Sequence, residues 1–241
     1  MKGTMIGTEI LRLLMLGWDE CVAKPFVRMA PKKSGRRILC FGDSNTWGSK
    51  PGSGLRYAFR ERWPGVLQTV LGQEFVVIEE GRNGRTTVLD DPDQRGCNGK
   101  PALEKYLRHH QPVDLVILLL GTNDLKASFK RSAEQITQGM EELGRMVLSN
   151  GQSSKGAVPL LLLVSPPTIM GEARANGCFQ GADQKSVLLV EQYRQVAGRL
   201  GCEFFDAGAV IQSSHIDGVH WDREAHHTFG QILAKDVSLL F

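Results

Sequence analysis

Residues 38–44 of this chain are Ile38-Leu39-Cys40-Phe41-Gly42-Asp43-Ser44, and they are the clearest indication of its fold class. Four apolar residues that end at a glycine are typical of a short buried strand followed by a turn. In an open α/β sheet, the turn after such a strand lies at the carboxyl edge, where ligands bind. A serine there becomes a nucleophile when a base takes its proton. The stretch predicts a parallel sheet and makes Ser44 the first candidate catalytic residue.

Strand patterns alternate with helix patterns along the rest of the chain. This alternation predicts an α/β fold, a three-layer α/β/α sandwich around a five-stranded, parallel, doubly wound sheet. After the strand at 38–41, strands are expected at 74–79, 113–120, 159–164 and 203–205. Helices are expected at 63–71, 101–109, 133–149, 183–200 and 223–240.

The length of 241 residues and an apolar fraction of 41% suit one globular domain, which we place at residues 36–241. Residues 1–35 are interpreted as an N-terminal extension. Its apolar run at 10–16 contains Arg12 and is too short to span a membrane, so no membrane partner is expected.

The overall charge and the cysteines exclude several classes of function. A formal net charge of +3 without a long basic run argues against a nucleic-acid partner. The five cysteines are scattered without Cys-x-x-Cys spacing, which suggests neither a metal site nor a redox motif. Reduced thiols of this kind predict a cytoplasmic protein.

Four polar segments each follow a predicted strand. Doubly wound topology brings such segments to one edge of the sheet. They are Ser44 with its neighbours, Gly81–Thr87, Gly121–Asp124 and Asp217–His220.

The last segment supplies a base for Ser44. An Asp and a His three residues apart face one another on a tight turn, so Asp217 can orient His220 while the other ring nitrogen reaches the serine. Candidate oxyanion donors are the main-chain N–H groups of Ser44 and Gly84 and the side-chain amide of Asn123. The pattern is that of a catalytic triad with an oxyanion hole, which requires no metal or cofactor.

Each of these motifs also occurs by chance as an ordinary turn, and only their joint occurrence favours catalysis. Asp43 and Asp124 are candidate pocket residues, and Asp43 is also expected to hold the Ser44 turn through main-chain N–H groups. Trp47 is either a core anchor or a pocket wall, and we favour the wall. The long loops at 49–62, 89–100 and 165–182 are candidate pocket walls or subunit contacts.

The four segments resemble blocks I, II, III and V of the SGNH (GDSL) hydrolase superfamily, with Ser44, Gly84, Asn123 and His220 at the matching positions and Asp217 completing the triad. Ile-Leu-Cys-Phe-Gly-Asp-Ser, Leu-Gly-Thr-Asn-Asp and Val-Ser-Pro-Pro are similar to the bacterial arylesterase/acyltransferase (perhydrolase) branch. That resemblance implies the flavodoxin-like fold of the family, hydrolysis of short-chain and aryl esters, acyl transfer to alcohols or peroxide, and a homo-oligomer. The segment before Arg36 and the 49–62 loop depart from the branch.

The leading hypothesis is a serine esterase that acts on a small-molecule ester. A carbohydrate deacetylase or a thioesterase on the same scaffold is the nearest alternative. A non-catalytic nucleotide-binding module is a third hypothesis, although the chain has neither Gly-x-Gly-x-x-Gly nor a P-loop pattern. The absence of a Gly-x-Ser-x-Gly elbow disfavours an α/β-hydrolase.

Overall fold

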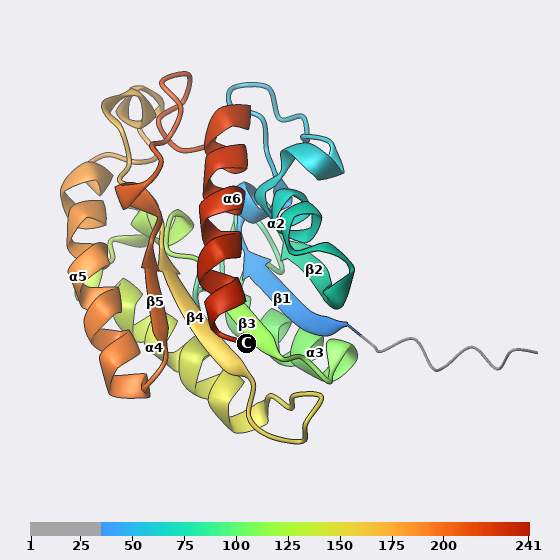
Figure 1. Ribbon diagram of the computed structural model, residues 1–241. Coiled ribbons are helices and arrows are strands. Elements are labelled where there is room, and N and C mark those ends of the chain that lie inside the picture. The colour runs from blue at the N-terminus through green and yellow to red at the C-terminus, as the bar shows by residue number, and fades with distance from the viewer. Residues whose placement is uncertain (1–34) are drawn as a thin grey trace, which may run out of the picture. The chain divides into compact units, whose positions relative to one another are not determined.

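Five parallel strands form one sheet in the order β2-β1-β3-β4-β5 (Figure 1). The computed structural model describes residues 35–241, which group into one compact unit. The predicted extension, apart from residue 35, lies outside the described residues. The strands are β1 (Arg36–Gly42), β2 (Phe75–Gly81), β3 (Leu115–Leu119), β4 (Leu160–Ser165) and β5 (Glu203–Asp206).

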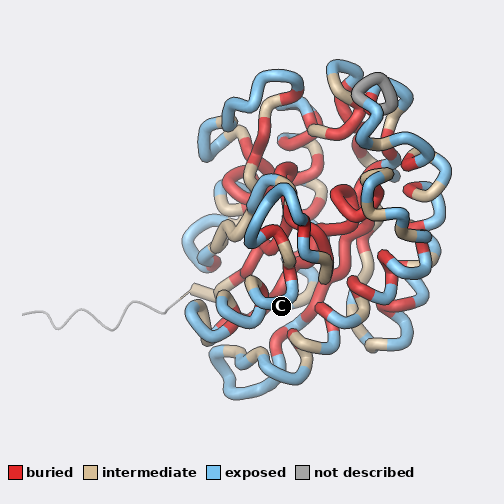
Figure 2. The backbone as a smooth tube through the Cα atoms, turned by 180° about the vertical axis from the view of Figure 1, so that it is seen from behind, coloured by how far each residue is buried: buried red, intermediate tan, exposed pale blue. Residues whose placement is uncertain are grey.

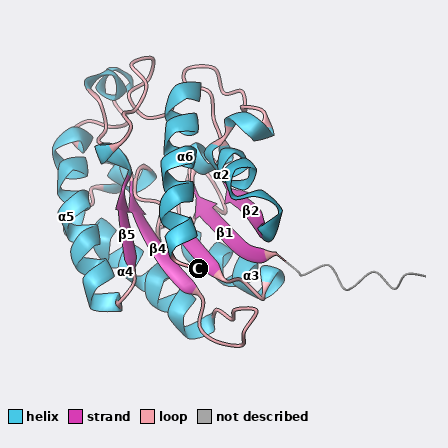
Figure 3. Cartoon of the chain, in the orientation of Figure 1, coloured by secondary structure: helices cyan, strands magenta, loops and turns pink. Residues whose placement is uncertain are grey.

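Helices cover both faces of the sheet, so the predicted three-layer sandwich is confirmed (Figures 1 and 3). Helices α2 and α6 lie on one face and helices α3, α4 and α5 on the other. In the described part of the chain, no helix is long and apolar enough to cross a lipid bilayer. The helices are α1 (Ser44–Trp47), α2 (Trp63–Leu71), α3 (Gly99–His110), α4 (Ala133–Asn150), α5 (Ala182–Leu200) and α6 (Arg223–Leu239).

The apolar run of β1 is continuous because both of its faces are buried. Ile38 and Cys40 pack on the side of α2 and α6, whereas Leu39 and Phe41 pack on the side of α3, α4 and α5. All four side chains are 0% exposed. Strand β3 alternates between the two layers in the same way, and the burial colouring shows this buried centre inside exposed loops (Figure 2). A strand buried on both faces holds the residue that follows it in a fixed position.

The ends of the predicted elements shift by one or two residues, for reasons visible in the contacts. Strand β2 continues past the predicted end at Glu79, because Glu80 and Gly81 pair in the sheet with Phe41 and Gly42 of β1. Strand β3 begins later than predicted, and the main-chain N–H of Val113 donates to the Gln152 carbonyl instead of joining the sheet. Helix α1, one turn long, was not predicted.

Candidate active site

The loops that follow β1, β2 and β3, together with the segment between β5 and α6, surround a cavity of about 420 Å³. The sheet order places β1 between β2 and β3, so the loops after these three strands are neighbours. The structure thus brings together the five residues that the sequence assigned to the triad and the oxyanion hole. The residues that line the cavity include Ser44, Gly84, Asn123, Asp217 and His220.

Ser44 is the first residue of helix α1, directly after β1. The side chain of Asp43 caps this helix, because its Oδ1 accepts the main-chain N–H of Asn45 at 2.9 Å. The carbonyl of Ser44 accepts the N–H groups of Gly48 at 2.8 Å and Ser49 at 2.9 Å. The serine is 5% exposed, so its surroundings fix it on the wall of the cavity.

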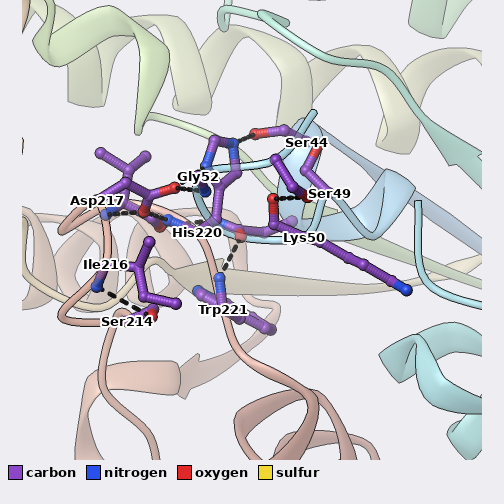
Figure 4. Close-up of polar contacts among 12 residues, drawn as sticks. Ser44, Ser49, Lys50, Gly52, Ser214, Ile216, Asp217, His220 and Trp221 are labelled. Carbon is purple, nitrogen blue, oxygen red and sulfur yellow. Dashed lines mark hydrogen bonds and ion pairs between the residues drawn. The ribbon is translucent and has the colours of Figure 1, made fainter. Parts of the chain in front are cut away.

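Ser44, His220 and Asp217 form a continuous chain of hydrogen bonds (Figure 4). The distance from Ser44 Oγ to His220 Nε2 is 3.0 Å, and that from His220 Nδ1 to Asp217 Oδ2 is 2.8 Å. A carboxylate only accepts hydrogen bonds, so Nδ1 carries the proton and Nε2 is the acceptor for the serine hydroxyl. The arrangement has the geometry of a nucleophile, a base and an orienting group.

The environment of Asp217 keeps its carboxyl group ionised. Partial burial acts to raise the pKa of Asp217, but the hydrogen bonds from the His220 ring and from the main-chain N–H groups of His220 and Val219 outweigh burial. The pKa therefore lies well below its usual range. The main-chain N–H of Gly52 adds a further donor at 2.9 Å (Figure 4). A fixed negative charge beside Nδ1 stabilises the imidazolium that forms when His220 takes the serine proton.

Asn45 connects the serine to the segment that carries the base, a role that sequence reasoning missed. Its Nδ2 donates to the carbonyl of Val219 at 3.2 Å, and its Oδ1 accepts the main-chain N–H of Trp221 at 3.1 Å. These two residues flank His220, and Asn45 is only 2% exposed. The side chain of Asn45, next to the candidate nucleophile, therefore helps to position His220, the candidate base.

The oxyanion side of the cavity is formed by the loops after β2 and β3. Gly84 has a φ of 77°, in the left-handed region that favours glycine, and a Cβ at this position would lie 2.0 Å from Gln94 Oε1, so the Gln94 side chain would have to move. Asn123 donates one amide N–H to the Arg85 carbonyl at 3.0 Å. An asparagine amide has two N–H groups, and the second is free to serve a bound oxyanion.

The structure does not bring the three predicted pocket residues into this cavity, which corrects that prediction. Asp43 is occupied as the helix cap, 1% exposed, and burial raises its pKa to about 6. Asp124 is 0% exposed and accepts from Thr87 N–H at 2.9 Å and Thr87 Oγ1 at 2.5 Å, which ties the Gly84 loop to the Asn123 loop. Trp47 lines a different cavity, with the Arg56 guanidinium 4.9 Å from its ring centre.

Most of the remaining wall residues come from the three long loops, which the sequence predicted as pocket walls without naming individual residues. The 49–62 loop contributes small and polar groups, whereas the 165–182 loop contributes mainly apolar ones. Loop length was the available signal, but which side chains face inward depends on contacts between distant segments. These loops provide Ser49, Lys50, Gly52, Gln94, Cys178 and Phe179.

Comparison with protein families identifies the same region of the chain. The model of the GDSL-like Lipase/Acylhydrolase family matches residues 40–228, from the end of β1 into α6. A curated acetylxylan esterase from Xylanibacter ruminicola is 25% identical over 227 residues. The match covers 86% of this chain and 44% of that protein, so the chain spans less than half the length of this relative.

Two solved structures resemble this one more closely. A carbohydrate acetylesterase from Sinorhizobium meliloti is 40% identical, with a TM-score of 0.81 over 86% of this chain and 100% of that chain. An aryl esterase from M. smegmatis gives the same identity, TM-score and coverage. The chain belongs to the GDSL-like lipase/acylhydrolase family, the SGNH hydrolases, and is a carboxylic ester hydrolase.

Proposed function

We propose that this esterase hydrolyses short-chain carboxylic esters, aryl esters among them, through an acyl-enzyme on Ser44. The observation that carries the proposal is the hydrogen-bonded chain from Asp217 through His220 to Ser44 at the wall of the cavity. Gly84 and Asn123 line the same cavity and supply the remaining parts of an acyl-transfer site.

The geometry supports a two-step reaction. Ser44 Oγ attacks the ester carbonyl while His220 Nε2 takes the hydroxyl proton, and the carbonyl oxygen becomes an oxyanion. The main-chain N–H groups of Ser44 and Gly84 and the side chain of Asn123 stabilise that charge. His220 then gives the proton to the leaving alcohol, and a water molecule activated by the same nitrogen releases the acid and restores Ser44.

The cavity favours small substrates. Its volume of about 420 Å³ lies in the lower part of the usual range for ligand pockets, roughly 300 to 1,000 Å³. Phe179 and Val219 provide apolar contact, and Ser49 and Asn83 provide polar groups. An ester of a short acyl group with an aryl or sugar alcohol has both apolar and polar parts, and so it can contact both kinds of lining residue.

A carbohydrate deacetylase is the second candidate, favoured by the carbohydrate acetylesterase that is 40% identical and by the polar wall. A thioesterase would use the same catalytic residues, and it differs from the other candidates in that a thiol, not an alcohol, leaves the substrate. Acyl transfer to an alcohol or peroxide is part of the proposal, since either nucleophile can replace water at the acyl-enzyme. Homo-oligomerisation and a cytoplasmic location stay predictions from the sequence.

A substrate panel tests these alternatives. The panel contains p-nitrophenyl esters of increasing acyl length, an acetylated xylose and an acetyl thioester, each with and without an added alcohol acceptor. We expect the highest kcat/KM on acetyl aryl esters and a second, transesterified product when alcohol is present. A preference for the acetylated sugar would assign the protein as a deacetylase instead, and a preference for the thioester would assign it as a thioesterase.

A further inference from the structure

A second cavity, of about 540 Å³, lies next to the catalytic one. The two cavities share Asn83 and Gln94 as lining residues. The second cavity is lined by three arginines, Arg82, Arg85 and Arg95. The reaction described above uses none of these arginines, so their gathering at one cavity needs a separate explanation.

The positive charge of this cavity is only partly offset by carboxylates: Glu80 and the buried Asp43 favour the charged form of Arg85, which burial disfavours more strongly. Within residues 35–241, none of the three arginines forms an ion pair. The two carboxylates at the end of β2 are already occupied. Glu79 pairs with Arg62 at 2.6 Å, and Glu80 pairs with His110 at 2.6 Å.

Arg85 is the most unusual of the three because it is 1% exposed. Its Nη1 donates to the main-chain carbonyls of Gly42, at 2.8 Å, and Glu80, while its buried Nε has no hydrogen-bond partner among the residues that the structure describes. The guanidinium lies 4.2 Å from the centre of the Phe41 ring. Burial lowers the pKa of Arg85 to about 10. A buried cation with an unsatisfied donor is costly unless an anion approaches it.

Arg82 and Arg95 complete the wall from the solvent side. Both are exposed, and Arg82 Nη2 donates to the main-chain carbonyl of Arg95 at 3.0 Å, which holds the two segments together. A guanidinium presents N–H groups in a fork that matches the two oxygens of a carboxylate or phosphate. Trp47 and Tyr106 add aromatic surface to the same cavity.

We propose that this arginine-lined cavity binds the carboxylate or phosphate group of a small organic anion, beside the catalytic cavity and separate from it. Arg82 and Arg95 hold the anion at the opening of the cavity, and Arg85 provides the fixed charge behind them. The aromatic side chains of Trp47 and Tyr106 pack against the organic part of the ligand.

Calorimetric titration with two probes, inorganic phosphate and benzoate, tests the proposal at an ionic strength held constant with sodium chloride. We expect saturable binding of at least one probe in the millimolar range or below, with a rise in Tm. The double variant Arg82→Gln/Arg95→Gln is expected to weaken that binding by about tenfold or more, since it removes two charge-assisted contacts. Arg85 is left unchanged because its loss could unfold the sheet edge.

The matched control is Arg60→Gln/Arg108→Gln, which removes two exposed arginines away from this cavity and gives the same net charge. We expect it to bind both probes as the wild type does. Binding of phosphate alone would indicate a phosphate-bearing ligand, and binding of benzoate alone an aromatic carboxylate. The proposal is overturned if neither probe binds to the folded wild type, or if the two double variants lose affinity equally.

Discussion

At the scale of single residues, Asn45 shows how a side chain outside the triad controls it. This buried amide bonds to the main chain on both sides of His220, and so it determines the distance from the imidazole to Ser44. Asn45→Ala leaves a buried carbonyl and a buried N–H group unpaired. We expect a loss of about 1–3 kcal/mol in the free energy of unfolding and a fall in kcat of up to about 100-fold, with KM little changed. Urea denaturation and steady-state kinetics measure both effects, and a wild-type kcat would contradict the assigned role.

Gly84 offers a second test at this scale. An alanine there would meet Gln94 Oε1 and would strain a main chain with a φ of 77°, so the loop that carries the candidate oxyanion N–H is expected to shift. We expect Gly84→Ala to lower kcat by about 100- to 1000-fold, the usual cost of losing one such donor.

Gly156→Ala is the matched control for that substitution. Gly156 has a φ of 73°, close to the 77° of Gly84, but a Cβ there would meet no atom within 4 Å. Both variants therefore share the backbone strain, and only Gly84→Ala disturbs the cavity. A similar fall in kcat for both variants would show that strain, and not the oxyanion donor, limits activity.

At the scale of elements, the 49–62 loop is more ordered than its length suggests. Ser49 and Arg56 form an antiparallel bridge, so residues 49–56 make a hairpin. Its tip reaches Asp217, where the Gly52 N–H donates to the same oxygen that accepts His220 Nδ1. The hairpin therefore helps to hold the carboxylate of the triad.

Replacing residues 51–54 with the two-residue turn Asn-Gly shortens the hairpin and removes that donor. We expect kcat to fall by about tenfold or more, since a hydrogen bond to a charged group contributes about 1.5–3 kcal/mol. The Tm should change little, because Gly52, Ser53 and Gly54 are exposed and only Pro51 among the replaced residues is buried. Kinetics on a p-nitrophenyl ester with a parallel melting curve measures both quantities. An unchanged kcat in the shortened protein would show that the hairpin does not help to hold the Asp217 carboxylate.

The same elements show what the sequence could and could not predict. The apolar runs of β1 and β3 predicted a sheet buried on both faces, and parallel topology then placed Ser44, Gly84 and Asn123 at one edge. The contact between Gly52 and Asp217 joins residues 165 positions apart and leaves no local pattern. Trp47 was assigned to the wrong cavity because the turn of α1, which directs its side chain, was not predicted.

At the scale of the whole molecule, His226 makes stability depend on pH. This residue of α6 is 0% exposed, and burial lowers its pKa from 6.5 to about 3. Between these values the unfolded chain takes up a proton that the folded chain does not accept. The free energy of unfolding therefore falls as the pH falls from 6.5 towards 3, with a limiting slope of about 1.4 kcal/mol per pH unit from this group.

His226→Gln is the comparison that isolates this effect, because glutamine does not titrate. Asp43 and Asp124, whose pKa values burial raises to about 6, act in the opposite direction but remain in both proteins. We expect the variant to gain stability relative to the wild type between neutral pH and about pH 5, as measured by urea denaturation. A constant difference over that range would show that His226 does not contribute.

The central claim is that acyl transfer passes through Ser44, and the most direct measurement is the capture of the acyl-enzyme. The enzyme is mixed with p-nitrophenyl acetate, quenched in acid during turnover, digested and analysed by mass spectrometry. The account predicts an acetyl group on Ser44 in the wild type, none at that position in Ser44→Ala, and a fall in kcat of about 1000-fold or more for that variant. An acetyl group carried through turnover on another residue, or wild-type turnover by Ser44→Ala, would contradict it.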